Sequence, residues 1–409
     1  MATLHPFRAQ RPHPDAVEDV ASVPYDVISV AEARELAAGN PRSFLHVIRP
    51  EIDLPPGTDE HADAVYETGA ENLRAFMEAD YTTREDEPAL YVYRLVMDGR
   101  AQTGLFGCVS VAEYDNDTIL KHEKTRPAKE DDRTRHILTQ EAHAEPVMLT
   151  FRDVESVNTL IAAAQEGEPL YDFTADDGVQ HTLWRVEAPA SLVKAFADVP
   201  KLYIADGHHR CKASSRAANV MRGSGRHESE DVSAEYEFFP AVLFPMSQMH
   251  IMAYNRVVHE LPMPPADFLE ALDERMPLTR NVDDPVPPEK EMVCFYLDGA
   301  WHRATLPPTK RGTVSDELDV ARLSEHMLEP LLAITDVRRD PNINFVGGIR
   351  GTDELEDRVD QGEAALAVSM APTSIEELIA VSDAGLLMPP KSTWFEPKLR
   401  SGLLVHPFD

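Results

Sequence analysis

The sequence predicts a mixed α+β fold, in which β-hairpins occur together with strand–helix units. Two hairpins are indicated by the favoured Asp-Gly turn between apolar runs, at Asp98-Gly99 and at Asp298-Gly299. A short apolar run at 202–204 breaks at Asp206-Gly207 and leads into an Ala- and Arg-rich segment, 210–221, that has the composition of a helix. The sequence contains no internal repeat and no low-complexity segment, which fits compact α+β domains.

The N-terminal elements follow from local signals. Residues 22–28 are expected to form the edge of a strand. Ser29 and Glu32 form a capping box for a helix that Gly39 stops. Further strands are expected over 44–48, 90–96, 103–111, 147–151, 182–186 and 239–244, and further helices over 62–79, 154–166 and 191–197.

The chain has 409 residues, which is long enough for two domains. The composition shifts at the proline-rich stretch 262–265, so the expected domains are 1–261 and 262–409.

In the second domain, apolar residues at spacings of three and four predict an amphipathic helix over 320–334. A capping box from Thr373 to Glu376 begins another helix, which ends by Gly385. The strands of the second hairpin are expected over 292–297 and 301–306.

The charge of the chain limits its partners. It has 71 acidic and 39 basic residues, a formal net charge of −32. Such a chain is poorly suited to non-specific binding of nucleic acid or of anionic membranes, so neither is an expected partner. No segment approaches the roughly 20 apolar residues of a membrane span. The N-terminus lacks a secretory apolar run, and a cytoplasmic protein is therefore expected.

An anionic substrate would need a local basic patch that opposes this overall charge. Basic residues concentrate in 121–135, 201–216 and 391–400, which are the candidate walls of a site.

The cysteines and adjacent histidines give no metal signal. Cys108, Cys211 and Cys294 are widely spaced and form no CxxC pair, which argues against a structural zinc site and a disulfide framework. The neighbouring His208 and His209 do not project like zinc ligands on one helix face, so no metal ligand is assigned. Cys211 could sense redox state, and the alternative is a buried thiol.

Residues 206–210, Asp-Gly-His-His-Arg, are here called the anion turn. A strand that turns at glycine into a helix start directs free backbone N–H groups and the positive end of the helix dipole at one spot. Two histidines and an arginine add charge and forked donors suited to phosphate oxygens. The sequence thus predicts that Gly207, His208, His209 and Arg210 bind phosphate. The alternative is a polar turn whose histidines are only solvated.

A second cluster, 121–133, alternates acidic and basic residues. This mixture suits a phosphate or nucleotide ligand with an associated divalent cation. The alternative is a solvated, charged helix face with intrahelical ion pairs. The candidate cofactor-binding residues of this cluster are His122, Glu123, Thr125, Lys129 and Arg133.

A third stretch, 388–398, places Lys391 beside the hydroxyl groups of Ser392 and Thr393, with prolines on both sides. A lysine beside hydroxyls can hold a phosphate as a point charge, so these three residues are also candidates for cofactor binding. The stretch lacks the glycines of a Walker A loop. A docking loop that covers the site is an equally good interpretation.

The candidate catalytic residues include carboxylates that could accept a hydroxyl proton near a bound phosphoryl donor. Asp26 lies in the expected strand edge, and it could equally be an ordinary turn or cap acid. Glu51 is a weaker candidate of the same kind. Asp206 and His209 of the anion turn complete the set.

Five ordered stretches resemble the bacterial and archaeal family known as domain of unknown function 1015, over nearly the full length of the chain. They are 23–28; 40–46; 122–125 with Lys129 and Asp132-Arg133; 205–210; and 389–393.

The anion turn is also similar to the phosphate-binding box of the ParB/sulfiredoxin superfamily, which includes free serine kinases. This resemblance implies a ParB/sulfiredoxin-like N-terminal catalytic domain, with an additional C-terminal α/β region that can close the site. It implies that 207–210 cradle the phosphates of ATP or ADP, that Mg²⁺ bridges them, and that a carboxylate activates the acceptor hydroxyl. The serine kinases use a glutamate early in the chain, where this sequence offers Asp26 and then Glu51.

The function that the resemblance implies is that of a nucleotide-dependent small-molecule kinase, with the hydroxyl of free L-serine or a similar metabolite as acceptor. One alternative is a nucleotide or phosphoester hydrolase, and another is a non-catalytic regulator that binds nucleotide. The expected partners are the nucleotide and a small hydroxyl substrate, and a homodimer is an open option.

Overall fold

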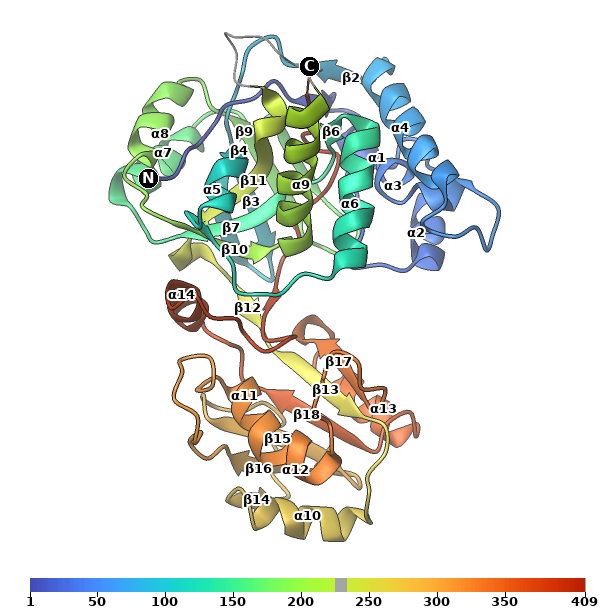
Figure 1. Ribbon diagram of the computed structural model, residues 1–409, viewed down its shortest axis with the longest axis vertical. Coiled ribbons are helices and arrows are strands. Elements are labelled where there is room, and N and C mark those ends of the chain that lie inside the picture. The colour runs from blue at the N-terminus through green and yellow to red at the C-terminus, as the bar shows by residue number, and fades with distance from the viewer. Residues whose placement is uncertain (225–233, 409) are drawn as a thin grey trace. The chain divides into compact units, whose positions relative to one another are not determined.

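The structure, a computed structural model of the chain, describes residues 1–224 and 234–408. It forms two compact units (Figure 1). Unit 1 comprises Met1–Met249 and Pro397–Asp409, and unit 2 comprises His250–Glu396. Each unit combines helices with a multistranded sheet, which confirms the expected mixed α+β class.

The division between the units differs from the boundary expected at residue 262. β13 (Tyr254–Val258) precedes that residue, yet it pairs with β17 (Ile343–Gly347) and β18 (Leu366–Met370) of unit 2. The end of the chain returns to unit 1, where β20 (His406–Pro407) pairs with β6. Strand pairing across long sequence distances decides the division, and local composition does not record it.

The main sheet of unit 1 has the strand order β5-β10-β7-β11-β4-β3-β9-β8. β10 is an interior strand, parallel to β5 and antiparallel to β7. Two small sheets, β1-β2 and β6-β20, complete this unit. The strands besides β20 are β1 (Gln10–Pro12), β2 (Thr82–Arg84), β3 (Tyr91–Met97), β4 (Arg100–Ser110), β5 (Ile119–Leu120), β6 (Ala142–His143), β7 (Val147–Phe151), β8 (Tyr171–Thr174), β9 (Gln180–Arg185), β10 (Leu202–Asp206) and β11 (Phe238–Pro245).

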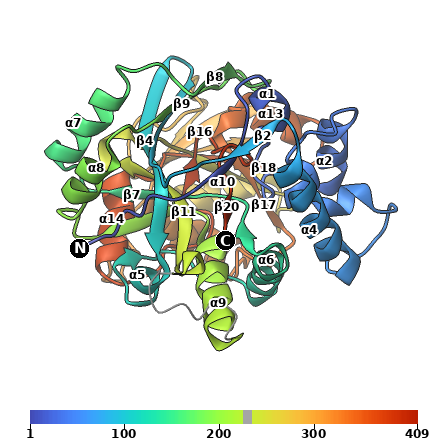
Figure 2. The same ribbon diagram turned by 90° about the horizontal axis from the view of Figure 1, so that it is seen from above.

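The helices of unit 1 pack around two apolar cores. The larger core joins the main sheet to α7, α8 and α9, through residues such as Val157, Phe196 and Ala217. The smaller one lies among α2, α3 and α4, around Phe44 and Leu73. α6 and α9 run side by side in both views (Figures 1 and 2). The α-helices are α1 (Val17–Val20), α2 (Val30–Ala37), α3 (Leu45–Ile48), α4 (Asp63–Glu78), α5 (Val111–Asp115), α6 (Pro127–Gln140), α7 (Glu155–Ala164), α8 (Pro189–Phe196) and α9 (His208–Ser224); short 3₁₀ turns cover Pro50–Asp53, Glu235–Glu237 and Met246–Gln248.

Unit 2 is built on a sheet with the order β14-β16-β15-β18-β13-β17 and a small pair, β12-β19. Its apolar cluster includes Val257, Trp301 and Leu355, so α13 packs on this sheet. The remaining strands are β12 (Ile251–Met252), β14 (Leu278–Arg280), β15 (Met292–Leu297), β16 (Ala300–Thr305) and β19 (Trp394–Phe395). The helices are α10 (Pro265–Asp273), α11 (Asp319–Leu323), a π turn (Ser324–Leu328), α12 (Glu329–Leu332), a 3₁₀ turn (Gly348–Arg350), α13 (Asp353–Asp360) and α14 (Ile375–Asp383).

Both expected hairpins are confirmed. β3 pairs with β4 and β15 with β16, each through the predicted Asp-Gly turn. Asp98 and Asp298 have φ values of 51° and 52°, and Gly99 and Gly299 have 76° and 75°. Two successive positive φ values are what the favoured two-residue hairpin turn requires, which explains why this signal is reliable.

Two expected strands are wrong. Within residues 22–28, all of which are described, only Ser22 joins a β-bridge, to Ser401, and the rest form irregular chain, a turn and a bend. The apolar run 44–48 contains the helix α3 instead of a strand. Four apolar residues around one histidine have no period that separates a strand from a buried helical turn, so the tertiary packing decides.

The capping box of α14 lies one residue later than expected. Ser374 Oγ accepts a hydrogen bond from the backbone N–H of Glu377 at 3.2 Å, and the Glu377 carboxylate accepts one from the backbone N–H of Ser374 at 2.8 Å. Thr373 instead donates its hydroxyl to Ser392 O at 2.8 Å. The helix begins where the reciprocal pair satisfies both free donors.

The described helices include none that is both long and apolar enough to cross a membrane. Cys108, Cys211 and Cys294 are buried and have free thiols. Burial raises the pKa of Cys211 to about 12. The thiolate is the reactive form of cysteine, so the structure gives no support to a redox-sensing role for Cys211.

Candidate functional site

The anion turn lies at the end of β10, where the chain passes from the interior of the sheet into α9. Gly207 has a φ of 100°, a backbone conformation that L residues with a side chain rarely adopt. A Cβ at this position would lie 3.0 Å from Val147 Cγ1 and 3.1 Å from Arg210 Nε. Both the backbone and its neighbours therefore require glycine. α9 begins at His208, earlier than the start expected at residue 210.

His208 joins the first turn of α9 to the stretch before α6. Its Nε2 accepts a hydrogen bond from the backbone N–H of His122 at 3.4 Å, and the two rings meet edge to face with centroids 4.4 Å apart. Burial and the neighbouring His122 hold the pKa of His208 well below its usual range, so this ring is neutral. Its proton then lies on Nδ1, which is 3.8 Å from Glu123 Oε2.

His122 is itself buried, and burial lowers its pKa to about 4, with partial compensation from Asp206. Its Nδ1 meets no hydrogen-bond partner among the described residues. This neutral ring lies beside the anion turn, and its unused nitrogen can form a hydrogen bond with a ligand.

His209 joins the same turn of α9 to the start of α6. Its Nε2 accepts a hydrogen bond from the backbone N–H of Arg126, the residue before the first turn of α6, at 3.1 Å. Burial, followed by the charge of Arg126, lowers the pKa of His209. A neutral ring that accepts at Nε2 carries its proton on Nδ1. In this state His209 can donate a hydrogen bond to a substrate but cannot take a proton from it.

Arg210 is buried and surrounded by carboxylates. Its Nη1 donates to Pro146 O, and its Nη2 lies 3.6 Å from Asp206 Oδ2. Burial alone would lower its pKa, but Asp26, Asp206 and Glu145 outweigh burial and raise it, so the guanidinium is always charged. Arg210 Nε is buried and has no hydrogen-bond acceptor within the described chain.

Asp206 lies between two cations, because Lys398 Nζ and Arg210 Nη2 are each 3.6 Å from Asp206 Oδ2. Its side chain is 29% exposed. Burial would raise the pKa of Asp206, but Lys398 and Arg210 lower it to about 2. A carboxylate held so firmly in the charged form is a weak proton acceptor at neutral pH, so Asp206 suits a counter-ion better than a base.

Arg133, a predicted binding residue of the second cluster, lies on α6 and contacts Asp132, Glu145 and Tyr25. Its guanidinium donates to Asp132 Oδ2 from Nε at 2.9 Å, and its Nη1 lies 3.8 Å from Glu145 Oε2. The same guanidinium stacks 4.0 Å above the ring of Tyr25. Arg133 thereby connects α6 to the loop that carries Asp26.

The other members of the second cluster lie around the start of α6. Thr125, just before α6, donates its Oγ1 hydrogen to Oε1 of Glu130, in the first turn of this helix, at 2.6 Å. Glu123 is exposed, and its Oε2 lies 3.8 Å from His208 Nδ1. Lys129 is half-buried and adds positive charge near His209. The structure therefore brings this cluster to the anion turn, and its interpretation as a wholly solvated helix face does not hold for His122 and Arg133.

The two predicted bases end in different surroundings. Asp26 is exposed on a loop, and its charge is the largest of the carboxylate effects that raise the pKa of Arg210. Glu51 is buried on a 3₁₀ turn and is paired with Arg49 Nε at 3.0 Å. Burial raises the pKa of Glu51, and Arg49 offsets part of this rise. Asp26 thus accompanies the anion turn, whereas Glu51 is engaged with Arg49.

The third stretch belongs to unit 2, and its polar groups are used there. Lys391 Nζ donates to Tyr254 Oη at 2.8 Å. Ser392 Oγ donates to Pro389 O at 2.6 Å, and Ser392 O accepts from Thr373 Oγ1. Phosphate binding by Lys391, Ser392 and Thr393 stays a prediction.

Two residues at the site were not singled out from the sequence. Lys398 lies in the basic stretch 391–400 and could have been selected for its charge. Glu145 carries no local signal, although its carboxylate accepts from Tyr25 N–H and from Ser401 Oγ, both at 3.3 Å. Both reach the turn only through the tertiary fold.

The arrangement fits an anionic ligand better than a metal ion held by the protein alone. The charged, buried guanidinium of Arg210 and the buried, unused Nδ1 of His122 suit the oxygens of an anionic ligand. Among residues 1–224 and 234–408, no group of three or more His, Cys, Asp and Glu side chains could hold a metal ion.

These features define an α+β protein with a buried, cation-rich turn at a helix start. The chain belongs to the family described as protein of unknown function DUF1015, whose family model matches residues 4–321. The comparison with curated proteins gives no match.

Several solved structures are distantly similar. A C-terminally truncated SbnI from Staphylococcus aureus is 13% identical, with 74% of this chain and 87% of that chain covered and a TM-score of 0.38. A conserved hypothetical protein from Pyrococcus furiosus is 12% identical, with coverages of 74% and 95% and a TM-score of 0.35. Free serine kinase in complex with AMP is 12% identical, with coverages of 73% and 91% and a TM-score of 0.35.

Proposed function

We propose that this protein is a nucleotide-dependent kinase that phosphorylates the hydroxyl group of a small molecule, free L-serine or a similar metabolite. The observation that carries this proposal is the meeting of two helix starts at the anion turn, where His209 Nε2 accepts from Arg126 N–H at 3.1 Å. The first turn of each helix has N–H groups without intrahelical partners and a partial positive charge. Phosphate groups bind at such positions.

The side chains around the two helix starts complement phosphate oxygens. Gly207 lets the chain turn from β10 into α9, because its φ of 100° is one that residues with a side chain rarely adopt. Arg210 supplies a charged donor that carboxylates hold in place. Lys398 and Lys129 add positive charge in a chain whose net charge is −32. This local reversal of charge is what an anionic substrate needs to bind here.

The transfer step requires positioning and charge neutralisation more than covalent help from the protein. The acceptor hydroxyl oxygen forms a bond to the terminal phosphorus of ATP or ADP. The bridging P–O bond breaks, and ADP or AMP leaves with the electron pair. The hydroxyl proton passes to a carboxylate beside Arg210, where both Asp26 and Glu145 lie.

Mg²⁺ would neutralise phosphate charge when it is bound with the nucleotide, and the exposed carboxylate of Glu123 would hold it together with phosphate oxygens. Arg210 would stabilise the charge on the transferring phosphoryl group.

Phosphorus NMR of the full-length protein with Mg²⁺, ATP or ADP and a pool of free amino acids tests the proposal. We expect a new phosphomonoester signal that depends on one hydroxyl-bearing acceptor. Loss of nucleotide without this signal would show that the protein is a hydrolase and not a kinase. An unchanged spectrum, together with protection against thermal unfolding by nucleotide, would replace it by a non-catalytic nucleotide-binding regulator.

A further inference from the structure

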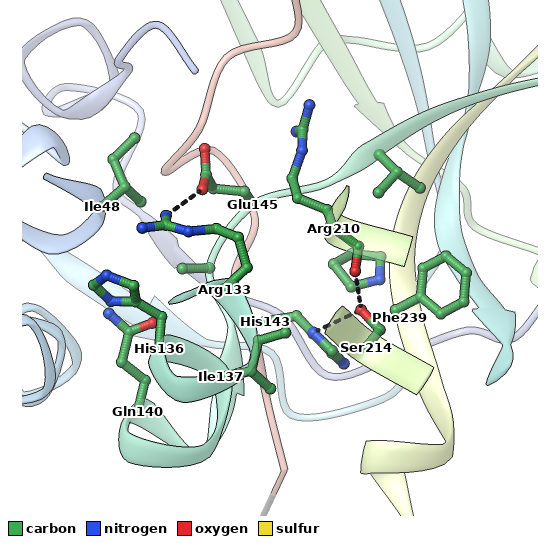
Figure 3. Close-up of a pocket in the computed structure, with 13 residues that line it drawn as sticks. Ile48, Arg133, His136, Ile137, Gln140, His143, Glu145, Arg210, Ser214 and Phe239 are labelled. Atoms are coloured by element: carbon green, nitrogen blue, oxygen red, sulfur yellow. Dashed lines mark hydrogen bonds and ion pairs between the residues drawn. The ribbon is translucent and has the colours of Figure 1, made fainter. Parts of the chain in front are cut away.

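A cavity of about 40 Å³ adjoins the anion turn, between α6, α9 and the segment after β6 (Figure 3). Its volume suits a few water molecules or one small polar group, and it is too small for a nucleotide. Arg133, Glu145 and Arg210 line it together. Figure 3 shows the Glu145 carboxylate between the side chains of Arg133 and Arg210 in this view.

Glu145 is a buried carboxylate with spare capacity to accept hydrogen bonds. Its side chain is only 7% exposed. Oε1 accepts from Tyr25 N–H and Ser401 Oγ at 3.3 Å, whereas Oε2 has the 3.8 Å ion pair with Arg133 Nη1. A distance of 3.8 Å is too long for a direct hydrogen bond, so Oε2 can accept a proton donor from the cavity.

Arg210 offers the complementary donor to the same cavity. Its Nη1 and Nη2 are engaged by Pro146 O and Asp206, whereas its buried Nε lacks an acceptor in the part of the chain that the structure describes. A group placed between Arg210 and Glu145 therefore has to accept one hydrogen bond and donate another. An alcohol hydroxyl meets both requirements.

We propose that this cavity receives the hydroxyl group of the phosphoryl acceptor, an aliphatic alcohol, and that Glu145 is the catalytic residue that takes its proton. This rests on the proposed kinase activity. Arg210 Nε–H donates to the hydroxyl oxygen, and the O–H proton is transferred to Glu145 Oε2 as the oxygen bonds to phosphorus. The nucleotide leaves with the electron pair of the broken P–O bond, and Glu145 later releases its proton to water.

The electrostatic surroundings of Glu145 agree with this role. Burial raises its pKa, while Arg210 on α9 and Arg133 on α6 offset part of the rise. Asp26, from the loop that also carries Tyr25, faces it as a like charge, and Ser401 faces it from the C-terminal segment. A base with a raised pKa is better matched to proton transfer near neutral pH than an ordinary carboxylate.

Asp26 then acts as a positioning residue. It is exposed, and its charge is the largest carboxylate contribution to the raised pKa of Arg210. It balances the charge of Arg210, and it is not among the residues that line the cavity, whereas Glu145 is.

Turnover of the full-length protein, measured against pH with saturating nucleotide and alcohol acceptor, tests the assignment. Glu145→Gln should lower kcat by about 100-fold or more and remove the acid limb of the pH profile, as expected for loss of a general base. Asp26→Asn should keep that limb. Glu166→Gln, which removes one exposed charge after α7, is the control and should leave the profile unchanged. Survival of the acid limb in Glu145→Gln would overturn the proposal.

Chemical rescue separates a catalytic role from a structural one. Glu145→Ala enlarges the cavity, so added formate should enter it and restore part of kcat, in proportion to formate concentration. Asp26→Ala should show no such rescue. A Glu145→Ala protein that is folded by thermal unfolding but is not restored by formate would contradict the role of Glu145.

The two proposals fail in different ways. An active wild-type protein whose Glu145→Gln variant stays active overturns the base assignment alone. In a second outcome, the wild-type protein hydrolyses nucleotide but transfers no phosphate to alcohols, and Glu145→Gln loses the hydrolysis. This would overturn both the kinase activity and the binding of an alcohol in the cavity, because water would then occupy it. A wild-type protein inert toward nucleotide overturns both.

Discussion

The anion turn of unit 1 and the loop 389–393 of unit 2 both carry basic residues that predict phosphate binding, but the contacts of these residues differ. In the loop, Lys391 Nζ is used by Tyr254 Oη and also lies 5.1 Å from the centre of that ring. In the turn, the buried Arg210 Nε finds no acceptor among the described residues. Basic residues indicate where an anion could bind, whereas a buried donor left unused in a folded site indicates where a ligand has to supply an acceptor.

The largest effect is expected for Gly207→Val. A side chain at a φ of 100°, with its Cβ 3.0 Å from Val147 Cγ1, should lower the free energy of unfolding by about 2–3 kcal/mol and abolish stabilisation by nucleotide. Urea unfolding with and without ADP measures both. Gly178→Ala is a matched control, because Gly178 has a φ of 79° with no atom within 4 Å of its Cβ position. If a folded Gly207→Val protein still bound nucleotide, the anion turn would not be part of the nucleotide site.

The direct test of the comparison is Arg210→Lys against Lys391→Met. Loss of the forked, carboxylate-held guanidinium should lower kcat/KM by about 100-fold, because lysine cannot reproduce its geometry. Lys391→Met should have a smaller effect, since its ammonium group is used within unit 2. Steady-state kinetics on both variants decide the order, and a larger loss in Lys391→Met would reverse the comparison.

Two carboxylates of unit 1 should respond to pH with opposite signs. The pKa of Asp206 is lowered to about 2, so it stabilises the fold above its unfolded pKa near 4, and this contribution is lost as pH falls toward 2. Asp206→Asn should therefore destabilise at pH 7 by on the order of 1–2 kcal/mol, and this difference should vanish in acid. Denaturant unfolding at a series of pH values from 7 to 2 measures it, and part of the difference should remain at pH 3, which lies between the folded and unfolded pKa values.

The pKa of Glu145 is raised by burial, so its charged form costs stability above that pKa, and the cost disappears as pH falls below it. Glu145→Gln should unfold at a higher temperature than the wild-type protein at pH 7 and lose this advantage in acid. A destabilised Glu145→Gln at pH 7 would mean that its ion pair with Arg133 outweighs its burial.

The smallest effect is expected for Thr373→Val. It removes the hydrogen bond from Thr373 Oγ1 to Ser392 O and should cost about 1 kcal/mol. Hydrogen exchange in 389–393 should speed up while the affinity of unit 1 for nucleotide stays constant. A weaker nucleotide affinity would instead connect the loop to ligand binding, as the sequence predicts.

The local elements were predictable because their causes lie within a few residues. Asp98-Gly99 forms its hairpin turn through two positive φ values, and β10 enters α9 through Gly207. The run 44–48 was not predictable as the helix α3, because its apolar residues fit a buried strand as well as a buried helical turn. The domain division also differed, since β13 pairs with β17 and β18 far along the chain.

The sequence by itself determined the class of fold and the chemical character of the anion turn. It could do so because glycine conformation, capping and strand–helix order act locally. Only the tertiary structure decided which distant groups complete the site: Arg126 reaches His209 across 83 positions, and Lys398 and Glu145 join from other segments. Such contacts depend on how the sheet and helices pack, and burial then sets the pKa of Glu145 and leaves Arg210 Nε unused among the described residues.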